Sequence, residues 1–492
     1  MDYLDPLRNR RNKIILFIGY FLITIMVGLS TVILFYITEG YGVNNNGEVI
    51  QKGLLFFSSQ PNPANIYING RLFSSQTNTS FLLPAGTYNI SLKATGYKTW
   101  YRSVIVNGGT VEHFDYPFLF PNKLSTVNKY SLNGVAGFDS QSLDRRWLLV
   151  ADPNQISQFY LYDLSNISTP PVTVTLPSGI LSSATSSQSW SLVQWSSDNR
   201  HVLLKHTYDN NFEYVLVDTQ NPVNSVNLDK SFSNIAFNQL SMINNDANSY
   251  YLYNSSTDTL SNINLNNPQV INQTLNGVLA YKSYSTDTLL YVTKDTSVSG
   301  RVLVEEQTGG KNYIVKSLPS ATNYLLNLAT YNSVPYVVVG DVSTGKIYIY
   351  QDPVSQLNNN PDSSPGPIQV LLVKNPLYIS FSTNAQFIMA ENNNTFAVYN
   401  LDSGYAYNYS VNYPMDLPQT NATWMDGDRL TYVSGGKLIV FDYDNQNLRV
   451  LTKSSPNLLA YFSPDYSNLY SLVPSSSTPA QTILTQTSLI AK

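Results

Sequence analysis

The chain of 492 residues contains no cysteine and only three histidines, and charged residues make up just 12% of it. Without cysteine there are neither disulfides nor thiolate metal sites, so the folded state must rest on the burial of apolar groups. A hydrophobic fraction of 43% over this length is enough for more than one core. The net charge of −4 lacks the basic excess of nucleic-acid-binding proteins, and we expect no nucleic-acid partner.

Charge is completely missing from one long apolar run, residues 14–37. As a helix rising about 1.5 Å per residue, this run is roughly 36 Å long and can cross a bilayer core of about 30 Å. A cleavable signal peptide would have an apolar core of only about 7 to 15 residues and a small-residue cleavage site, and neither is present. The sequence therefore predicts an uncleaved transmembrane signal anchor.

Basic residues precede the apolar run and determine its expected orientation. They are Arg8, Arg10, Arg11 and Lys13. Because positively charged flanks stay in the cytoplasm, we expect residues 1–13 to form a cytoplasmic tail and the chain beyond the anchor to be extracytoplasmic. The same side chains can contact anionic lipids. The predicted localisation is the cell membrane, with a single pass.

Residues 38–52 are polar and include an Asn- and Gly-rich stretch, which is typical of a spacer. The hydrophobic pattern then changes to a period of two. It predicts strands at residues 54–58, 65–68, 81–83, 87–94, 99–106 and 110–114. Asn69-Gly70 supplies the positive φ values of a tight hairpin turn, and residues 107–109 form a turn between the last two strands. We expect a small antiparallel β-domain at residues 53–120.

Four landmarks in this segment resemble the PEGA domain, a β-sandwich module of bacterial and archaeal envelope proteins. They are the corner at residues 61–64, the strand and turn at residues 66–70, the Pro-Ala-Gly-Thr-Tyr sequence at residues 84–88, and Gly96-Tyr97. The resemblance implies a non-enzymatic envelope module. Pro63 stands where the family usually has glycine, so this corner must be built differently if that glycine uses a positive φ.

Residues 128–492 repeat one pattern, in which an aromatic strand end is followed by a polar turn and an apolar strand. The eight aromatic markers are Phe138, Trp195, Phe237, Tyr281, Tyr331, Phe381, Trp424 and Phe462. Spacings of roughly 38 to 57 residues are typical of four-stranded propeller blades, and a closed ring leaves only short sheet edges. We predict a β-propeller of eight blades. Seven is the alternative, because the third and fifth repeats are degenerate.

The polar turns of the repeats resemble the W-S-P-D-G-K type found in TolB-like and WD40-like propellers. The resemblance is carried by residues 195–198 and 462–465, although Asn199 and Tyr466 replace the glycine of that motif. The similarity is to an architecture rather than to one family. Because Trp195 and Trp424 hold equivalent positions in two repeats, we expect each to be buried within its own blade.

Catalytic motifs are scarce. The sequence contains no G-x-S-x-G elbow, HExxH or P-loop. His201 and His206 lie on opposite faces of a predicted strand, with no cysteine or carboxylate cluster nearby, so we predict no metal and no cofactor. Acidic residues such as Asp198, Asp426 and Asp465 fall in predicted turns, where a solvated structural role is expected. Carboxylates that converge from different blades, as glycosidases require, remain an alternative.

One aromatic feature is a candidate ligand-binding site. Tyr405, Tyr407 and Tyr409 alternate along a predicted strand and so share one face. Tyrosine combines an apolar ring with a polar tip, which suits stacking on a sugar or anchoring a protein. The alternative is that the three rings pack between adjacent blades.

The sequence thus predicts an all-β protein apart from one N-terminal transmembrane helix, with a small PEGA-like β-sandwich followed by a β-propeller. The expected function is that of a membrane-anchored extracytoplasmic binding or scaffold protein, whose propeller recognises a protein or polysaccharide of the cell envelope. The alternative is a carbohydrate-active enzyme, a glycoside hydrolase or lyase, with carboxylates at the propeller mouth. A sensory role is less favoured, because a tail of about 13 residues is too short for a signalling domain.

Overall fold

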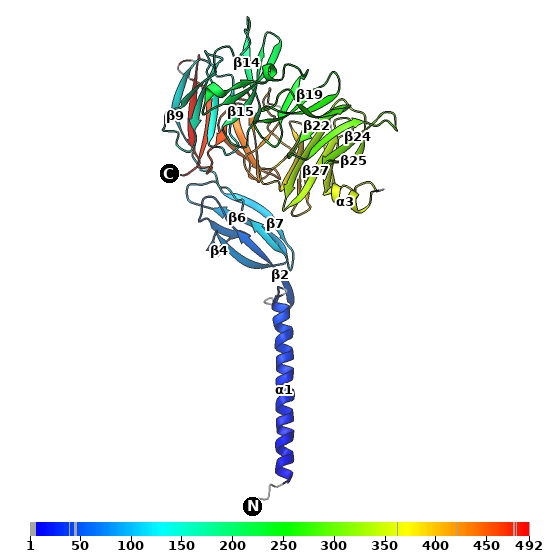
Figure 1. Ribbon diagram of the computed structural model, residues 1–492. Helices are drawn as coiled ribbons and strands as arrows, with labels where there is room; N and C mark the ends of the chain where they lie inside the picture. Colours follow the sequence, from blue (N-terminus) through cyan, green and yellow to red (C-terminus); the bar gives the residue numbers. More distant parts are fainter. Residues whose placement is uncertain are drawn as a thin grey trace, which may run out of the picture. The chain divides into compact units, whose positions relative to one another are not determined.

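The computed structural model describes residues 6–38, 40–43, 47–361, 363–419, 421–475, 478 and 480–491. The chain divides between Asn122 and Lys123 into two compact units. The first unit contains an N-terminal helix and a small pair of sheets, and the second contains a series of four-stranded sheets (Figure 1).

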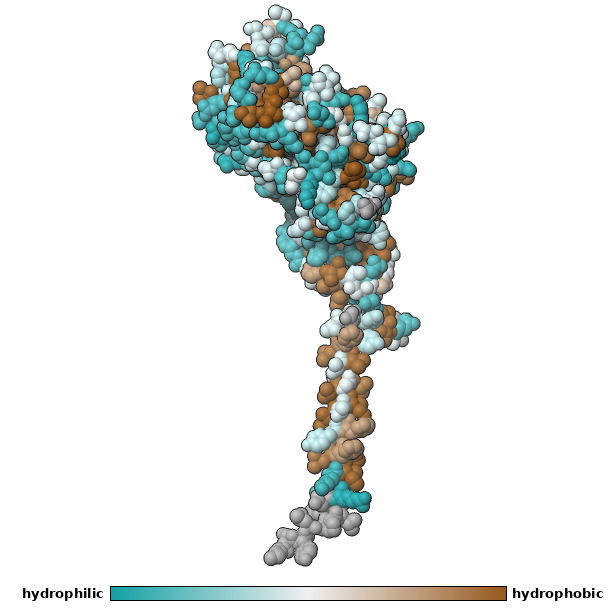
Figure 2. All heavy atoms as spheres, turned by 45° about the vertical axis from the view of Figure 1, so that its right-hand side comes forward, coloured by the Kyte–Doolittle hydropathy of each residue, from teal (hydrophilic) through white to brown (hydrophobic). Residues whose placement is uncertain are grey.

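Helix α1 (Pro6–Thr38) contains the predicted apolar run and extends it at its N-terminal end. Its stretch Arg10–Thr38 is long and apolar enough to cross a membrane, which fits either an anchor or a signal sequence. The large apolar side chains are exposed from Ile14 to Ile37, as the brown surface in Figure 2 shows. Thr24 and Thr31 donate their hydroxyl protons to carbonyls one turn earlier, so neither presents an unpaired donor to lipid.

Two four-stranded sheets form the β-sandwich. Its strands are β1 (Tyr41–Val43), β2 (Val49–Phe57), β3 (Asn65–Ile68), β4 (Arg71–Gln76), β5 (Thr79–Pro84), β6 (Gly86–Lys93), β7 (Trp100–Val106) and β8 (Val111–Phe114). One sheet has the order β4-β3-β6-β7, and in the other β2 pairs with β1, β5 and β8. Alternate residues face the space between the sheets, where Leu55, Ile66, Ile90 and Trp100 are fully buried.

The β3–β4 hairpin is confirmed, with φ values of 49° at Asn69 and 79° at Gly70. The final predicted pair is different, because β8 runs parallel to β2 and does not pair with β7. The chain crosses between the sheets at residues 107–109. It passes so close to β2 that a Cβ atom on Gly53 would lie 2.6 Å from the Asn107 carbonyl oxygen.

Two other predicted features, the spacer and the corner at Pro63, each contain a defined element of backbone structure. Residues 38–52 are not all unpaired, because β1 pairs with the start of β2 at Val49–Gln51. At the corner, the peptide bonds Gln60-Pro61 and Asn62-Pro63 are both cis. The four landmarks nevertheless fall in one sandwich, as the resemblance implied.

Within the described residues, the second unit contains eight four-stranded antiparallel sheets, numbered here as blades 1 to 8. Blade 1 comprises β10 (Asp139–Gln141), β11 (Trp147–Ala151), β12 (Gln158–Asp163) and β13 (Val172–Thr175). Blade 2 comprises β14 (Gln188–Trp195), β15 (His201–Tyr208), β16 (Asn211–Asp218) and β17 (Val226–Asn227). Blade 3 comprises β18 (Gln239–Met242), β19 (Ser249–Asn254), β20 (Thr259–Asn264) and β21 (Ile271–Asn276). Blade 4 comprises β22 (Val278–Ser283), β23 (Leu289–Lys294), β24 (Arg301–Thr308) and β25 (Lys311–Pro319).

The remaining blades follow the same order. Blade 5 comprises β26 (Tyr324–Tyr331), β27 (Val334–Asp341), β28 (Lys346–Gln351) and β29 (Gln369–Leu372). Blade 6 comprises β30 (Tyr378–Phe381), β31 (Phe387–Glu391), β32 (Thr395–Asn400) and β33 (Ala406–Ser410). Blade 7 comprises β34 (Thr423–Trp424), β35 (Arg429–Ser434), β36 (Lys437–Asp442) and β37 (Arg449–Lys453). Blade 8 comprises β38 (Tyr461–Phe462), β39 (Asn468–Pro474), β40 (Gln481–Ser488) and β9 (Ser125–Asn133).

Strand β9, from the start of the unit, completes blade 8 by pairing with the C-terminal strand β40. One apolar cluster joins blade 8 to blade 1, with Leu148 and Tyr162 packed among Tyr470 and Leu484. Similar clusters join blades 1 to 6 in sequence. The eight-bladed propeller is therefore confirmed, and the degenerate third and fifth repeats form regular blades.

Three short helical segments were not expected from the sequence. They are η1 (Pro222–Asn224), α2 (Leu228–Ser231) and α3 (Pro353–Asn359). The start of α3 does have a local signal, because Asp352 accepts a hydrogen bond from the Ser355 N–H and Pro353 follows it at the first helical position. All three lie between strands and do not alter the blades.

The antiparallel order gives each blade two distinct ends. Turns between the first and second strands and between the third and fourth strands lie at one end. We call this end of the ring the turn face, and in blade 1 it is formed by residues 142–146 and 164–171. The opposite end carries the turns between the second and third strands and the connections between blades, and we call it the connection face.

Candidate functional site

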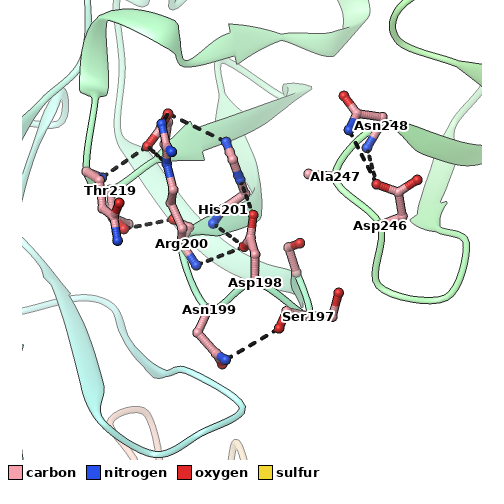
Figure 3. Close-up of polar contacts among 12 residues, drawn as sticks. Ser197, Asp198, Asn199, Arg200, His201, Thr219, Asp246, Ala247 and Asn248 are labelled. Atoms are coloured by element: carbon pink, nitrogen blue, oxygen red, sulfur yellow. Dashed lines mark hydrogen bonds and ion pairs between the residues drawn. The ribbon is translucent and has the colours of Figure 1, made fainter.

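The turn face is organised by a repeated acidic turn, which Figure 3 shows in blade 2. Asp198 Oδ1 accepts hydrogen bonds from the backbone N–H groups of Arg200 (2.9 Å) and His201 (3.0 Å). The Ser196 N–H donates to the His201 carbonyl oxygen (2.9 Å), which closes the turn. Asn199 occupies the position of the motif glycine and adopts a φ of 55°. The carboxylate thus satisfies backbone donors that the tight turn leaves unpaired.

Charged side chains continue from this turn to the end of strand β16. Arg200 Nε donates to Asp218 Oδ1 at 2.7 Å, and a second guanidinium nitrogen bonds the other carboxylate oxygen. His201 lies between two carboxylates, with Nδ1 2.6 Å from Asp198 Oδ2 and Nε2 3.5 Å from Asp218 Oδ2. Burial acts to raise the pKa of both aspartates, but their hydrogen bonds outweigh this effect. The backbone N–H groups of His201 and Arg200 and the His201 ring lower the pKa of Asp198 to about 2. The Arg200 guanidinium lowers the pKa of Asp218.

The same turn recurs in blades 1, 6 and 8, at residues 142–147, 382–387 and 463–468. In each, a serine N–H bonds the carbonyl five residues later, and the Asp or Asn in the third position accepts an N–H from two residues later. Blade 1 also repeats the ion pair, with Arg146 Nη2 2.8 Å from Asp163 Oδ2. Because the cluster recurs from blade to blade, it is best explained as a structural unit of the blade and not as a catalytic centre.

His206 has a different environment from His201. It is fully buried, with Nδ1 2.9 Å from Glu213 Oε1 and Nε2 2.9 Å from Gln188 Oε1. Glu213 also accepts hydrogen bonds from the N–H and hydroxyl of Ser182 and from the amide of Asn227. These bonds fasten the connection between blades 1 and 2. Among the described residues, no group of three or more His, Asp and Glu side chains is placed to hold a metal ion.

The three candidate tyrosines are not equivalent. Tyr409 is stacked on Phe396, and its hydroxyl donates to the Tyr443 carbonyl in the next blade (2.9 Å). The Tyr407 ring lies 5.4 Å from the Tyr443 ring in an edge-on contact. Both therefore pack between blades 6 and 7, which was the alternative interpretation. Tyr405 precedes β33 on the turn face and is 59% exposed, so it is the member of the set whose ring surface is available to a ligand.

The predicted tryptophans link adjacent blades. Trp195 is 2% exposed and donates its indole N–H to Ser140 Oγ of blade 1 at 2.8 Å. Trp424 is half-buried and makes the same bond to Ser380 of blade 6 at 2.9 Å. The expectation that each is buried within its own blade is therefore incomplete, since both rings also tie their blade to the preceding one.

Three buried carboxyl groups each have one oxygen without a hydrogen-bond partner among the described residues. They are Asp139, Glu306 and Glu391. Burial raises the pKa of Glu391 to about 8, although its other oxygen accepts a hydrogen bond from the Ala422 N–H. Burial, together with Asp352, raises the pKa of Glu306 to about 7. The three groups lie in strands of blades 1, 4 and 6, namely β10, β24 and β31.

The predicted topology residues lie in the first part of α1. Arg10, Arg11 and Lys13 are exposed, and Figure 2 shows hydrophilic side chains near that end of the helix. Arg8 is part of the helix, but its side chain lies outside the described residues. Positively charged side chains therefore precede the apolar part of the helix.

A polar pocket on the turn face was not anticipated from the sequence. It has a volume of about 390 Å³ and lies where blade 8 meets blade 1. Its lining includes Lys129, Asn166, Ser168, Asp465 and Gln486, from segments more than 300 residues apart in sequence. The two halves are brought together only by ring closure, so no local motif could have revealed them.

Comparison with family models agrees with the sandwich of the first unit. Residues 52–119 match the PEGA domain. No curated protein matches the chain. Among solved structures, the propeller domain of Cps50 (Swd1) from Myceliophteria thermophila is 14% identical, with a TM-score of 0.38, and covers 67% of this chain and 100% of its own.

Two further solved structures resemble this chain to about the same extent as the Cps50 propeller does. The Dos1 propeller is 12% identical, with a TM-score of 0.41, and covers 75% of this chain and 95% of its own. An oligogalacturonate lyase in complex with manganese is 8% identical, with a TM-score of 0.39, and covers 74% of this chain and 98% of its own. By its own sheets and the family match, the chain consists of an N-terminal apolar helix that is a candidate membrane anchor, a PEGA domain and an eight-bladed β-propeller.

Proposed function

We propose that this protein is a membrane-anchored binding or scaffold protein, with its propeller held outside the cytoplasm to recognise a component of the cell envelope. The observation that carries the proposal is the exposure of every large apolar side chain from Ile14 to Ile37 in α1. Burying this surface in lipid is strongly favourable, at roughly 25 cal/mol for each Å² removed from water. The basic residues at its start favour a cytoplasmic N-terminus.

The short path from helix to PEGA domain keeps that domain beside the membrane. Helix α1 ends at Thr38 and β1 begins at Tyr41. Three residues of extended chain span only about 10 Å. In the chain the PEGA domain stands between the candidate anchor and the propeller, which supports a scaffold role.

Recognition is assigned to the turn face, because it carries both Tyr405 and the polar pocket. An exposed tyrosine ring can stack on a sugar or fill a pocket of a protein partner. The acidic residues of the same face are engaged in holding the repeated turns, which favours binding over acid–base chemistry.

Membrane fractionation and envelope binding test this function. The full chain should remain with membranes after a high-salt wash and should leave them in detergent. The detergent-solubilised protein should then bind isolated cell envelopes, and the Tyr405→Ala variant should bind them several-fold more weakly. Tyr413→Ala is the matched control, because Tyr413 is 45% exposed and follows β33 at the connection face. A soluble protein, or one that binds no envelope component, would refute the proposal.

A further inference from the structure

We propose that the pocket between blades 8 and 1 binds one neutral sugar unit of an envelope polysaccharide. The inference rests on the proposed function and names a ligand class for the turn face. The pocket is walled by residues 164–168 of blade 1 and by the turn at residues 463–468 of blade 8, with β9 and β40 contributing Lys129 and Gln486. Its volume of about 390 Å³ lies in the lower part of the range for small-ligand sites, about 300 to 1,000 Å³.

The chemistry of the lining suits a ligand rich in hydroxyl groups. The lining carries the hydroxyls of Ser165 and Ser168, the amides of Asn166 and Gln486, and the ammonium of Lys129. The blade 8 turn adds Ser463, Ser467 and Asn468, whose side chains bond to one another or to the carboxylate of Asp465. Amides and hydroxyls can donate and accept at closely spaced positions, as sugar hydroxyls also do. One positive and one negative group leave the lining without net charge, which favours a neutral ligand over an acidic one.

Lys129 is the side chain best placed to anchor such a ligand. It is half-buried in β9 and has no ion-pair partner among the described residues, so its three N–H donors are available. Pro464 is the exposed apolar residue of the lining and offers contact surface for the C–H groups of a sugar ring, whereas Leu164 and Ile167 belong to the buried core that joins blades 8 and 1. Polar edges with an apolar patch are the combination that a sugar ring requires.

The pocket wall is held in place before any ligand binds. The Tyr130 hydroxyl of blade 8 lies 3.0 Å from the Ile167 carbonyl oxygen and 2.9 Å from that of Thr169. The Tyr470 hydroxyl, also from blade 8, donates to the Leu164 carbonyl at 3.2 Å. These bonds fix the loop of blade 1 against blade 8. A preformed wall reduces the entropic cost of binding, because fewer groups must be ordered.

Ligand-observed NMR on the detergent-solubilised full chain provides the test. The probes are the methyl glycosides of glucose, galactose and mannose, with glucuronate as the charged comparison. A ligand of about a dozen non-hydrogen atoms in an open polar pocket should bind with a Kd near the millimolar range. We expect saturable binding of at least one neutral glycoside, and weaker binding of glucuronate.

Two variants assign the binding to this pocket. Ser168→Phe fills it and should weaken glycoside binding at least tenfold, and Lys129→Met should weaken it several-fold. Ser403→Phe, in the equivalent turn of blade 6, and Lys453→Met, on the outer strand of blade 7, should leave binding unchanged. Thermal unfolding of each variant confirms that the ring is intact.

Several results would overturn the pocket assignment. They are the absence of binding by all three glycosides, binding that survives Ser168→Phe and Lys129→Met, equal losses in the control variants, or tighter binding of glucuronate. Envelope binding by the full chain that persists in Ser168→Phe, without glycoside binding, would reject the sugar site and leave the proposed function standing. Failure of the protein to enter membranes would instead reject the proposed function.

Discussion

The repeated turns place several non-glycine residues in the left-handed region, where a side chain is unfavourable. Arg145, Asn199, Ala385 and Tyr466 have φ values of 63°, 55°, 60° and 57°. Asparagine tolerates this conformation, whereas residues such as alanine and tyrosine are strained in it. The carboxylate or amide of the residue directly before each of them compensates, because it accepts hydrogen bonds from the backbone and holds the turn closed.

Ala385→Gly should therefore stabilise the propeller. Glycine adopts a positive φ without the steric cost that alanine pays, so we expect a gain of up to about 1 kcal/mol in the free energy of unfolding. Ala406→Gly is the control, since Ala406 lies in strand β33 and glycine there should destabilise by roughly 0.5 to 1 kcal/mol. Denaturant unfolding measures both. Destabilisation by Ala385→Gly would contradict the turn geometry.

The raised pKa of the buried Glu391 predicts how the stability of the protein depends on pH. Its pKa is about 8 in the folded protein, against 4.5 for an ordinary glutamate. Between these values the unfolded chain loses the proton while the folded chain keeps it, so stability falls as pH rises through this interval. Glu391→Gln removes the titration. The variant should match the wild type at pH 4 and become relatively more stable up to about pH 8, and parallel stability curves would show that Glu391 is not protonated.

The pH dependence of stability that Asp198 contributes has the opposite sign to that of Glu391. Its folded pKa of about 2 lies below the ordinary 3.8, so its contribution is present above the ordinary value and is lost as pH falls toward 2. Asp198→Asn should reduce stability at neutral pH and make the acid transition shallower. The amide fits the turn, because Asn384 occupies the same position in blade 6. An unchanged acid transition in a pH titration of unfolding would exclude this role.

At the scale of elements, the blade order follows from hydrophobic periodicity, but the bonds between blades do not. The markers Trp195 and Trp424 each donate to a serine in the first strand of the preceding blade. The aromatic position was evident in the sequence. Its partner was not, because the two residues are 55 and 44 positions apart and serine is common in this chain.

Ser140→Ala should reveal the energy of this link. The Trp195 indole N–H would lose its partner while remaining buried, which costs about 1 to 3 kcal/mol. Trp195→Ala should cost about 3 to 5 kcal/mol, because a large ring is also lost from the core. Ser380→Ala should cost less, since Trp424 is more exposed. A double-mutant cycle by chemical denaturation checks the coupling, and strictly additive losses for Ser140 and Trp195 would contradict it.

Local signals determined how much of the fold could be predicted. Asn69-Gly70 indicates its own hairpin, and alternating apolar residues indicate the strands. In contrast, β8 was assigned to the wrong neighbour, because the turn at residues 107–109 gives no information about which sheet the chain enters next. The sharing of one face by three tyrosines was also insufficient, since only the position of blade 7 decides that Tyr407 and Tyr409 are covered while Tyr405 is exposed.

At the scale of the whole molecule, the ring is closed by the two ends of the propeller unit. Strand β9 pairs with β40 along its length, and Thr126 and Thr487 share a hydrogen bond across this seam. The candidate sugar pocket lies at the same place, so ring closure creates the pocket. This long-range dependence explains why the site could not be recognised from sequence spacing.

The central claim is that α1 anchors a propeller outside the cytoplasm, and the absence of cysteine permits a direct test. Two single-cysteine variants, Asn9→Cys before the apolar run and Ser403→Cys on the exposed turn face, are treated in intact cells or spheroplasts with a membrane-impermeant maleimide. The account predicts labelling of Ser403→Cys without permeabilisation, labelling of Asn9→Cys only after it, and both in full-length protein that sediments with membranes. Labelling of Asn9→Cys alone in intact cells, or loss of the first 37 residues from the mature protein, would contradict it.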